Sequence, residues 1–105
     1  MILKDKVVLV TGSGAGIGEA IAVAMAEAGA QVVSADIDGA AAQKTADAAA
    51  AFQAKTLALE TDVGNVAEID AMVDRTVDEF GRLDIIVNNA GVTRRAYIMD
   101  LTEED

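Results

Sequence analysis

Residues 11–18 read TGSGAGIG, and they directly follow the apolar run VVLV at residues 7–10. When a strand passes through a glycine-rich turn into a helix, the first N–H groups of the helix have no partner within the helix and form a site for an anion. Glycine also allows positive φ angles and lets a pyrophosphate approach the backbone without meeting a Cβ atom. The stretch therefore predicts a phosphate-binding turn between a strand and a helix.

The order of residues in the turn decides between kinds of phosphate loop. A Walker loop needs Lys and then Ser or Thr after its last glycine, but Glu19 and Ala20 follow Gly18, which rejects a nucleoside triphosphatase. The common dinucleotide spacing G-x-G-x-x-G, started from Gly12, would place its third glycine where Ile17 stands. Neither of these two spacings therefore fits the turn.

The spacing that does fit is G-x-x-x-G-x-G, with Gly12, Gly16 and Gly18. In this register Gly14 is a spare glycine. The alternative is a turn that is merely flexible, but the strand before it, the amphipathic helix after it and an acid downstream argue against that alternative. We therefore interpret the turn as the phosphate site of a dinucleotide.

The downstream acid is Asp36, which follows the apolar run at residues 31–35 and lies 18 residues after Gly18. A carboxylate at about 20 residues from the turn accepts a hydrogen bond from a ribose 2′-OH and repels a 2′-phosphate. Ile37 and Ala15 supply no cation for such a phosphate. The sequence thus favours NAD over NADP, although an isolated Asp at this place would be interpreted as a turn former.

Apolar periodicity predicts alternating strands and helices along the chain. Strands are expected at residues 6–10, 31–35, 55–59 and 83–87. Three helices are expected. The first ends at Gly29, and the third runs from Asn65, with Glu68 completing a capping box, to Gly81. The second runs from a cap at Asp38 to Phe52, and the residues expected to face inward are Ala42, Thr45, Ala49 and Phe52. This alternation predicts an α/β fold with a parallel sheet, right-handed crossovers and helices on both faces.

Composition excludes several functions. The 105 residues suit one domain, and a net charge of −10 without a basic stripe disfavours nucleic-acid or anionic-membrane binding. The chain has no Cys and no His, so we expect no thiolate metal site and no metal centre. The apolar run at residues 7–10 is too short for a signal sequence or a membrane span, and we expect a cytoplasmic protein.

Four motifs together resemble the N-terminal half of the short-chain dehydrogenase/reductase family. They are Thr11-Gly12-x-x-x-Gly16-x-Gly18, Asp36, Asp62-Val63 and Asn88-Asn89-Ala90-Gly91. The resemblance implies a Rossmann-type sheet, here truncated to about four strands in the order 3-2-1-4 with three helices. The cofactor-binding residues that it implies are Thr11, Gly12, Ser13, Gly16, Ile17, Gly18, Asp36, Ile37, Asp62, Val63, Asn88, Ala90 and Gly91.

The resemblance also implies a role for each group of residues. The glycine turn, braced by Thr11, would hold the pyrophosphate, with Ile17 beside it and beside the nicotinamide ribose. Asp36 would hold the adenosine ribose and residues 62–63 the adenine edge. Residues 88, 90 and 91 would line the ribose side and the central sheet. The stretch at residues 88–105 resembles 3-oxoacyl-carrier-protein reductases, which usually take NADP, and related alcohol or sugar dehydrogenases.

By the resemblance, the family's Ser, its Tyr-x-x-x-Lys pair and a further Asn would lie beyond residue 105. Tyr97 is followed at the fourth position by Leu101, so it does not match that pair, and we expect it in a solvated loop. Protonating the alkoxide that forms on hydride transfer needs a positioned acid. We therefore expect no catalytic residue in residues 1–105, which would be the N-terminal half of a dinucleotide-binding domain and inactive alone.

A half-domain would leave the fourth strand as an edge of the sheet. Residues 85–87 read IIV, with no charge or Pro to blunt pairing with another chain. We therefore expect self-association through that strand. Two alternative functions stay open: a non-catalytic half-fold for binding or assembly, and an S-adenosylmethionine-binding domain, against which the NNAG motif and the glycine spacing stand.

Overall fold

A computed structural model describes residues 2–89 and the backbone of residues 97–100. The elements are β1 (Val7–Thr11), α1 (Gly16–Glu27), β2 (Gln31–Asp36), α2 (Gly39–Ala50), β3 (Thr56–Glu60), α3 (Val66–Phe80), β4 (Ile85–Asn88) and β5 (Tyr97–Asp100). Their strand order is β3-β2-β1-β4-β5. The first four strands are parallel to one another, so the predicted α/β fold and the order 3-2-1-4 are confirmed.

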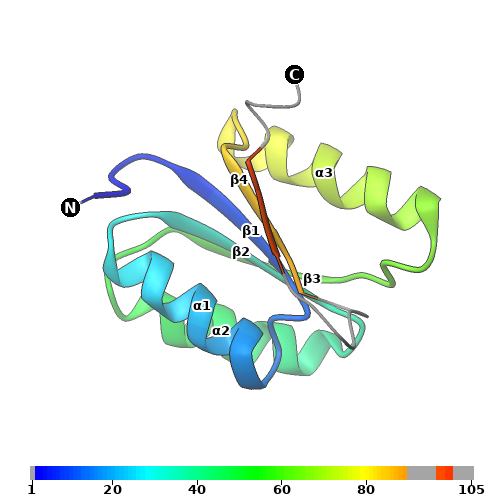
Figure 1. The fold of residues 1–105 in the computed structure, drawn as a ribbon, viewed down its shortest axis with the longest axis horizontal. Helices are drawn as coiled ribbons and strands as arrows, with labels where there is room; N and C mark the ends of the chain where they lie inside the picture. The colour runs from blue at the N-terminus through cyan, green and yellow to red at the C-terminus, as the bar shows by residue number, and fades with distance from the viewer. Residues whose placement is uncertain (1, 90–96, 101–105) are drawn as a thin grey trace.

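The helices cover both faces of the sheet (Figure 1). The α1 and α2 helices lie on one face and α3 lies on the other. This distribution follows from right-handed crossovers: the chain moves from β1 outward to β3 and then returns across the sheet to β4. The carboxyl ends of β1, β2 and β4 consequently meet at one edge, where parallel sheets bind ligands.

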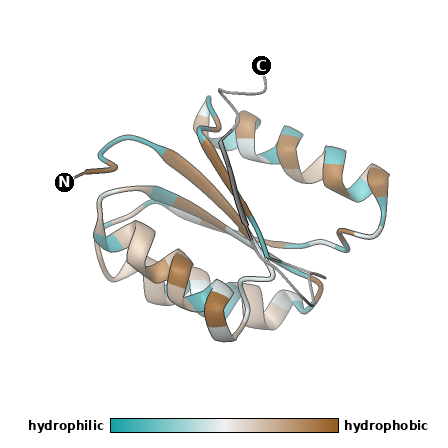
Figure 2. Cartoon of the chain, in the orientation of Figure 1, coloured by the Kyte–Doolittle hydropathy of each residue, from teal (hydrophilic) through white to brown (hydrophobic). Residues whose placement is uncertain are grey.

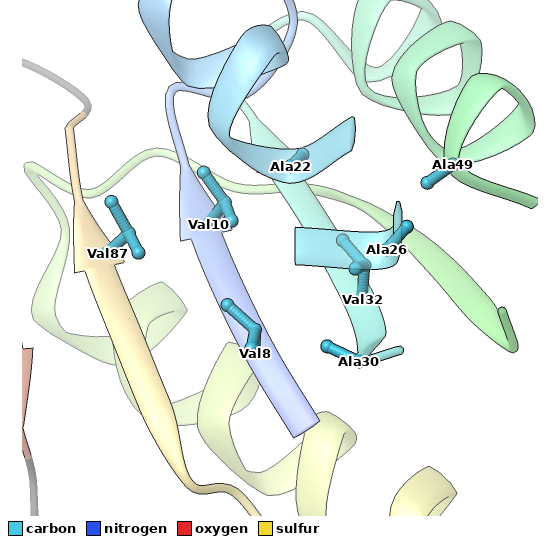
Figure 3. Packing of buried hydrophobic residues seen from close by; sticks show 8 residues of the cluster. All are labelled: Val8, Val10, Ala22, Ala26, Ala30, Val32, Ala49 and Val87. Atoms are coloured by element: carbon cyan, nitrogen blue, oxygen red, sulfur yellow. The ribbon is translucent and has the colours of Figure 1, made fainter. Parts of the chain in front are cut away.

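Small helix residues pack against branched strand residues on the α1 and α2 face. Ala22, Ala26 and Ala49 from the helices meet Val8, Val10, Val32 and Val87 from the strands (Figure 3). Because the helix residues at this contact are alanines, the helices approach the sheet closely. The central strands are strongly hydrophobic, whereas α2 is close to neutral in hydropathy (Figure 2).

The opposite face of the sheet packs against α3. Leu9, Val33 and Ala35 point to this side, because residues alternate between faces along a strand, and they surround Met72 of α3. Leu9 is level with Val33 and with Ile86 in the neighbouring strands. This face therefore has a core of its own, below a single helix.

Helix ends match most of the predicted signals. Gly29 and Gly81 both have positive φ angles, of 105° and 80°, where α1 and α3 end. The α2 helix ends at Ala50, however, and Phe52 lies in the following turn with 41% of its surface exposed. The expected inward position of Phe52 is therefore wrong, because the helix stops before that residue reaches the inner face.

The fourth strand is not an edge, which corrects the sequence-based expectation. The β5 strand pairs antiparallel with β4, with Asn88 opposite Tyr97 and Ile85 opposite Asp100. Tyr97 consequently lies in a strand rather than in a solvated loop. The physical reason is that the unpaired N–H and C=O groups of β4 are met by a later segment of the same chain.

No helix within the described ranges is long and apolar enough to cross a membrane.

Candidate functional site

The glycine turn joins β1 to α1 at the carboxyl edge of the sheet. Gly12 and Gly16 have φ angles of 63° and 61°, in the left-handed region that favours glycine. At Gly18 a Cβ atom would run into the Gly12 carbonyl oxygen, so the first turn of α1 packs directly on the loop. The three glycines of the predicted spacing are therefore each required by the backbone.

The amino end of α1 has no side-chain cap. Its N-cap residue, Ala15, is extended and has no side-chain oxygen, whereas the side chains of Asp38 and Asn65 cap α2 and α3 by accepting hydrogen bonds from the Ala41 and Glu68 N–H groups. The first N–H groups of α1 are thus left to a ligand or to water. Together with the helix dipole, this end favours an anion.

Asp36 lies beside the turn. Its Oδ2 accepts a hydrogen bond of 2.9 Å from the Gly14 N–H, and its Oδ1 accepts one of 2.9 Å from the Asp38 N–H. The carboxylate therefore links the glycine turn to the start of α2. The predicted proximity of turn and acid is present in the structure.

Gly14 is not spare, which corrects the sequence interpretation. A Cβ atom on this residue would lie 2.6 Å from Cβ of Ala41 and 2.9 Å from Oδ2 of Asp36. Both distances are far shorter than a van der Waals contact. Spacing along the chain gave no sign of this requirement, because Asp36 at the end of β2 and Ala41 in α2 are both more than 20 residues away in sequence.

Buried hydroxyl groups fix the turn to α2 from inside. Thr45 Oγ1 donates to the Ser13 carbonyl at 2.7 Å, and Ser13 and Ser34 Oγ lie 2.6 Å apart. Ser34 in turn donates to the Ala42 carbonyl at 2.9 Å. Ser13 is fully buried, and its N–H donates to the Ala35 carbonyl at 3.2 Å, so its hydroxyl and both of its backbone groups are bonded within the protein.

Sequence reasoning missed Ser34 and Thr45 as residues that support the site. A signal existed for each: Ser34 is the one polar residue among residues 32–35, which read VVSA, and Thr45 is on the expected inward face of the second helix. A buried hydroxyl needs a hydrogen-bond partner, but the pattern does not say which partner it has.

A second brace ties the turn to the end of β4. Thr11 Oγ1 accepts from the Asn89 N–H at 2.9 Å, and Asn89 Nδ2 donates to the Gly12 carbonyl at 3.2 Å. Thr11 Oγ1 also lies 3.3 Å from Oδ1 of Asn88. These hydrogen bonds join Thr11 and Gly12 to the end of β4, and Asn89 is a residue that the cofactor-binding residues predicted from the sequence did not include.

The segment after β3 forms a compact turn. Asp62 Oδ1 accepts from the Gly64 N–H at 2.9 Å, and the Asp62 N–H donates to Oε1 of Glu68 at 2.8 Å. Glu68 therefore supports this turn rather than returning to the Asn65 N–H as in a complete capping box. That N–H instead donates to the Asp62 carbonyl at 3.0 Å.

A cavity of about 720 Å³ joins these segments. Its lining includes seven of the predicted residues together with apolar residues of α3 and β4. The seven are Thr11, Gly12, Asp36, Ile37, Asp62, Val63 and Asn88. Ser13, Gly16, Ile17 and Gly18 do not line it, and Ala90 and Gly91 lie outside the described residues.

The charge of the cavity is negative. Asp36 and Asp62 line it, and the lining residues, all within the described part of the chain, include no Lys or Arg. The described residues also contain no group of three or more His, Cys, Asp or Glu side chains that could hold a metal ion. A smaller cavity of about 410 Å³, between α3 and the end of β3, lies apart from the glycine turn.

Comparison with known proteins gives a consistent family. The short chain dehydrogenase family matches residues 6–105. The chain is 43% identical, over all of its 105 residues, to a (2S)-[(R)-hydroxy(phenyl)methyl]succinyl-CoA dehydrogenase subunit of Thauera aromatica, of which it covers 42%. It is 45% identical over 104 residues to galactitol 2-dehydrogenase of Agrobacterium fabrum, covering 99% of this chain and 40% of that protein.

A solved structure agrees with the sequence relatives. A hydroxysteroid dehydrogenase from Escherichia coli superposes with a TM-score of 0.82 at 39% identity, over 86% of this chain and 38% of that one. The chain thus spans about 40% of the length of the relatives that it matches. From the family match and the shared fold, the chain belongs to the short-chain dehydrogenases, oxidoreductases that bind NAD or NADP.

Proposed function

We propose that residues 1–105 are the NAD-binding half of a short-chain oxidoreductase that, as a whole protein, transfers hydride between NAD and an alcohol or carbonyl substrate. The observation that carries the proposal is the link between Asp36 and the glycine turn, through the 2.9 Å hydrogen bond from the Gly14 N–H. This link supports the proposal because it joins the carboxylate that would accept from a ribose to the turn that would bind the pyrophosphate, and Asp36 and Gly12 both line the larger cavity.

The residues suit the parts of a dinucleotide. The uncapped start of α1 would bind the pyrophosphate, Asp36 would accept from the adenosine ribose, and Asp62 with Val63 would border the adenine. Ile17 and Ile37, exposed by 68% and 66%, offer apolar surface beside these groups. When bound, the cofactor supplies or accepts the hydride at its nicotinamide ring.

Charge supports NAD as the preferred cofactor. A 2′-phosphate next to Asp36 would place like charges together, and no cation among the residues lining the cavity would offset them.

We also propose that the isolated chain turns nothing over. A carbonyl that receives hydride needs a proton donor with a suitable pKa, commonly supplied by His, Tyr or Lys. The chain has no His, and Tyr97 has no Lys at the fourth position after it. Mixing the purified chain with NAD and a panel of alcohols should therefore give no NADH absorbance; measurable oxidation would contradict this proposal.

Fluorescence titration with NADH tests the binding function. Asp36→Ala should weaken NADH binding about ten- to a hundredfold, the effect of losing a hydrogen bond to a charged group. Asp70→Ala is the matched control, because it removes the same charge from an exposed position on α3 that does not line the cavity. The Asp70→Ala variant should bind NADH with the same affinity as the original chain.

Competing ligands separate the alternatives. Displacement of NADH by S-adenosylmethionine would point to a methyltransferase-type domain, and failure to bind NADH, NADPH and S-adenosylmethionine would leave a binding or assembly module. Saturable NADH binding that Asp36→Ala does not change would remove the assigned role of Asp36.

A further inference from the structure

Gly14 lies where three structural segments meet. Its N–H faces the Asp36 carboxylate at the end of β2, and the space for a Cβ atom is taken by Ala41 in the first turn of α2 and by Asp36 itself. The G-x-x-x-G-x-G spacing assigns no function to this residue. Its surroundings nevertheless leave no space for a side chain at this position.

We propose that Gly14 is a specificity-determining residue, which sets the preference for NAD over NADP by positioning the Asp36 carboxylate. This inference rests on the proposed NAD site. It adds a residue that does not itself meet the 2′ position and acts through Asp36.

The first part of the argument is the clamp on the carboxylate. Oδ2 of Asp36 accepts from the Gly14 N–H and Oδ1 accepts from the Asp38 N–H, both at 2.9 Å. With one donor on each oxygen, the carboxylate plane is held in one orientation. A carboxylate has about four acceptor positions, so two donors leave capacity for ribose hydroxyls. Acceptors that are already oriented bind a ligand at lower entropic cost.

The second part is the rigidity of what surrounds Gly14. The Thr45 hydroxyl donates to the carbonyl of Ser13, the residue before Gly14, and so ties the turn to α2. Ala41 is held in the first turn of α2 by the cap from Asp38, at 3.1 Å. The turn and the helix therefore resist separation.

A methyl group at position 14 consequently acts on the most mobile neighbour. The Asp36 carboxylate is the end of a partly buried side chain and is held only by two hydrogen bonds, whereas Cβ of Ala41 is fixed to the backbone of α2. We expect Gly14→Ala to push the carboxylate out of its clamp. The displaced group would accept poorly from the ribose and would repel a 2′-phosphate less.

The test compares NADH and NADPH affinities by fluorescence titration of the intact chain. The original chain should bind NADH more tightly than NADPH. In Gly14→Ala, NADH affinity should fall about tenfold while NADPH affinity stays equal or rises, so the ratio of the two dissociation constants moves toward one. A merely structural disturbance of the turn would weaken both cofactors equally, because both carry the pyrophosphate.

Two further variants keep the test decisive. Ala41→Gly alone should leave the NADH-to-NADPH ratio unchanged, since it adds no atom near Asp36. Gly14→Ala combined with Ala41→Gly removes the 2.6 Å contact between Cβ atoms and keeps the 2.9 Å contact with Oδ2. This double variant should fold even where the single one does not, as circular dichroism would show, and it should lose the preference for NADH.

The outcomes distinguish this inference from the proposed function. If the original chain prefers NADH and both Gly14 variants keep the original ratio, or lose both affinities equally, the role of Gly14 is overturned while the NAD site stands. If the original chain binds neither cofactor, the proposed function fails and the inference fails with it.

Discussion

Thr45 illustrates how a single buried side chain supports the site from behind. It is fully buried on α2, and its hydroxyl donates to the Ser13 carbonyl in the glycine turn, 32 residues away in sequence. Removing the donor would leave a buried carbonyl without its hydrogen bond. The cost of such a loss is about 1–3 kcal/mol.

Thr45→Val should therefore lower the free energy of unfolding by about 1–3 kcal/mol, measured by urea denaturation. Thr76→Val is the matched control. Thr76 is also fully buried, but its hydroxyl donates to the Met72 carbonyl four residues earlier in the same helix, which already takes part in the helical ladder. An equal loss of stability in both variants would contradict the special role of Thr45.

Between elements, Asp84 connects the starts of two neighbouring strands. It lies just before β4, and its Oδ2 accepts from the N–H of Val7, the first residue of β1, at 2.8 Å. Arg82 donates to both carboxylate oxygens, at 2.8 and 2.9 Å. The hydrogen bond from Arg82, and then that from the Val7 N–H, hold the pKa of Asp84 below its usual value.

This lowered pKa predicts how stability depends on pH. A group whose pKa is lower in the folded state contributes stability that is present above its unfolded pKa, about 3.9 for Asp, and is lost as pH falls through the folded pKa. The stability advantage of the original chain over Asp84→Asn should therefore be full at neutral pH and shrink below about pH 4. Urea denaturation at several pH values measures the difference in free energy of unfolding between the two proteins. If this difference is the same at neutral pH and below pH 4, the lowered pKa of Asp84 does not contribute to stability.

Helix ends show how far local patterns predict elements. Asn65 caps α3 as expected, because a cap needs only a side-chain oxygen and the N–H three residues later. The reciprocal bond of the capping box was predicted wrongly, since Glu68 accepts from Asp62 instead. Phe52 was also misplaced, because apolar spacing continued past the point where α2 ends.

At the scale of the molecule, β5 changes which edge of the sheet is open. The sheet runs from β3 to β5, so β4 is paired on both sides. Self-association of the chain stays a prediction, but the exposed fourth strand no longer provides its route. A segment that pairs with β4 also keeps the uncharged run at residues 85–87 away from other chains.

A chain that ends at residue 96 tests this protective role. Without β5, the edge of β4 should be open, and the shortened chain should self-associate at lower concentration than the 105-residue chain. Sedimentation velocity over a range of concentrations measures the difference. Identical sedimentation of the two chains would show that β5 does not protect β4.

The sequence by itself determined the alternation of strands and helices, the glycine turn and the acid at the end of β2. These features depend on periodicity and on short spacings, which the chain carries locally. Only the tertiary structure decided that Gly14 is required, that Thr45 holds the turn, and that β5 covers β4. Each depends on groups that are distant in sequence and touch only after folding: Gly14 and Asp36 are 22 residues apart, and Ser13 and Thr45 are 32 apart.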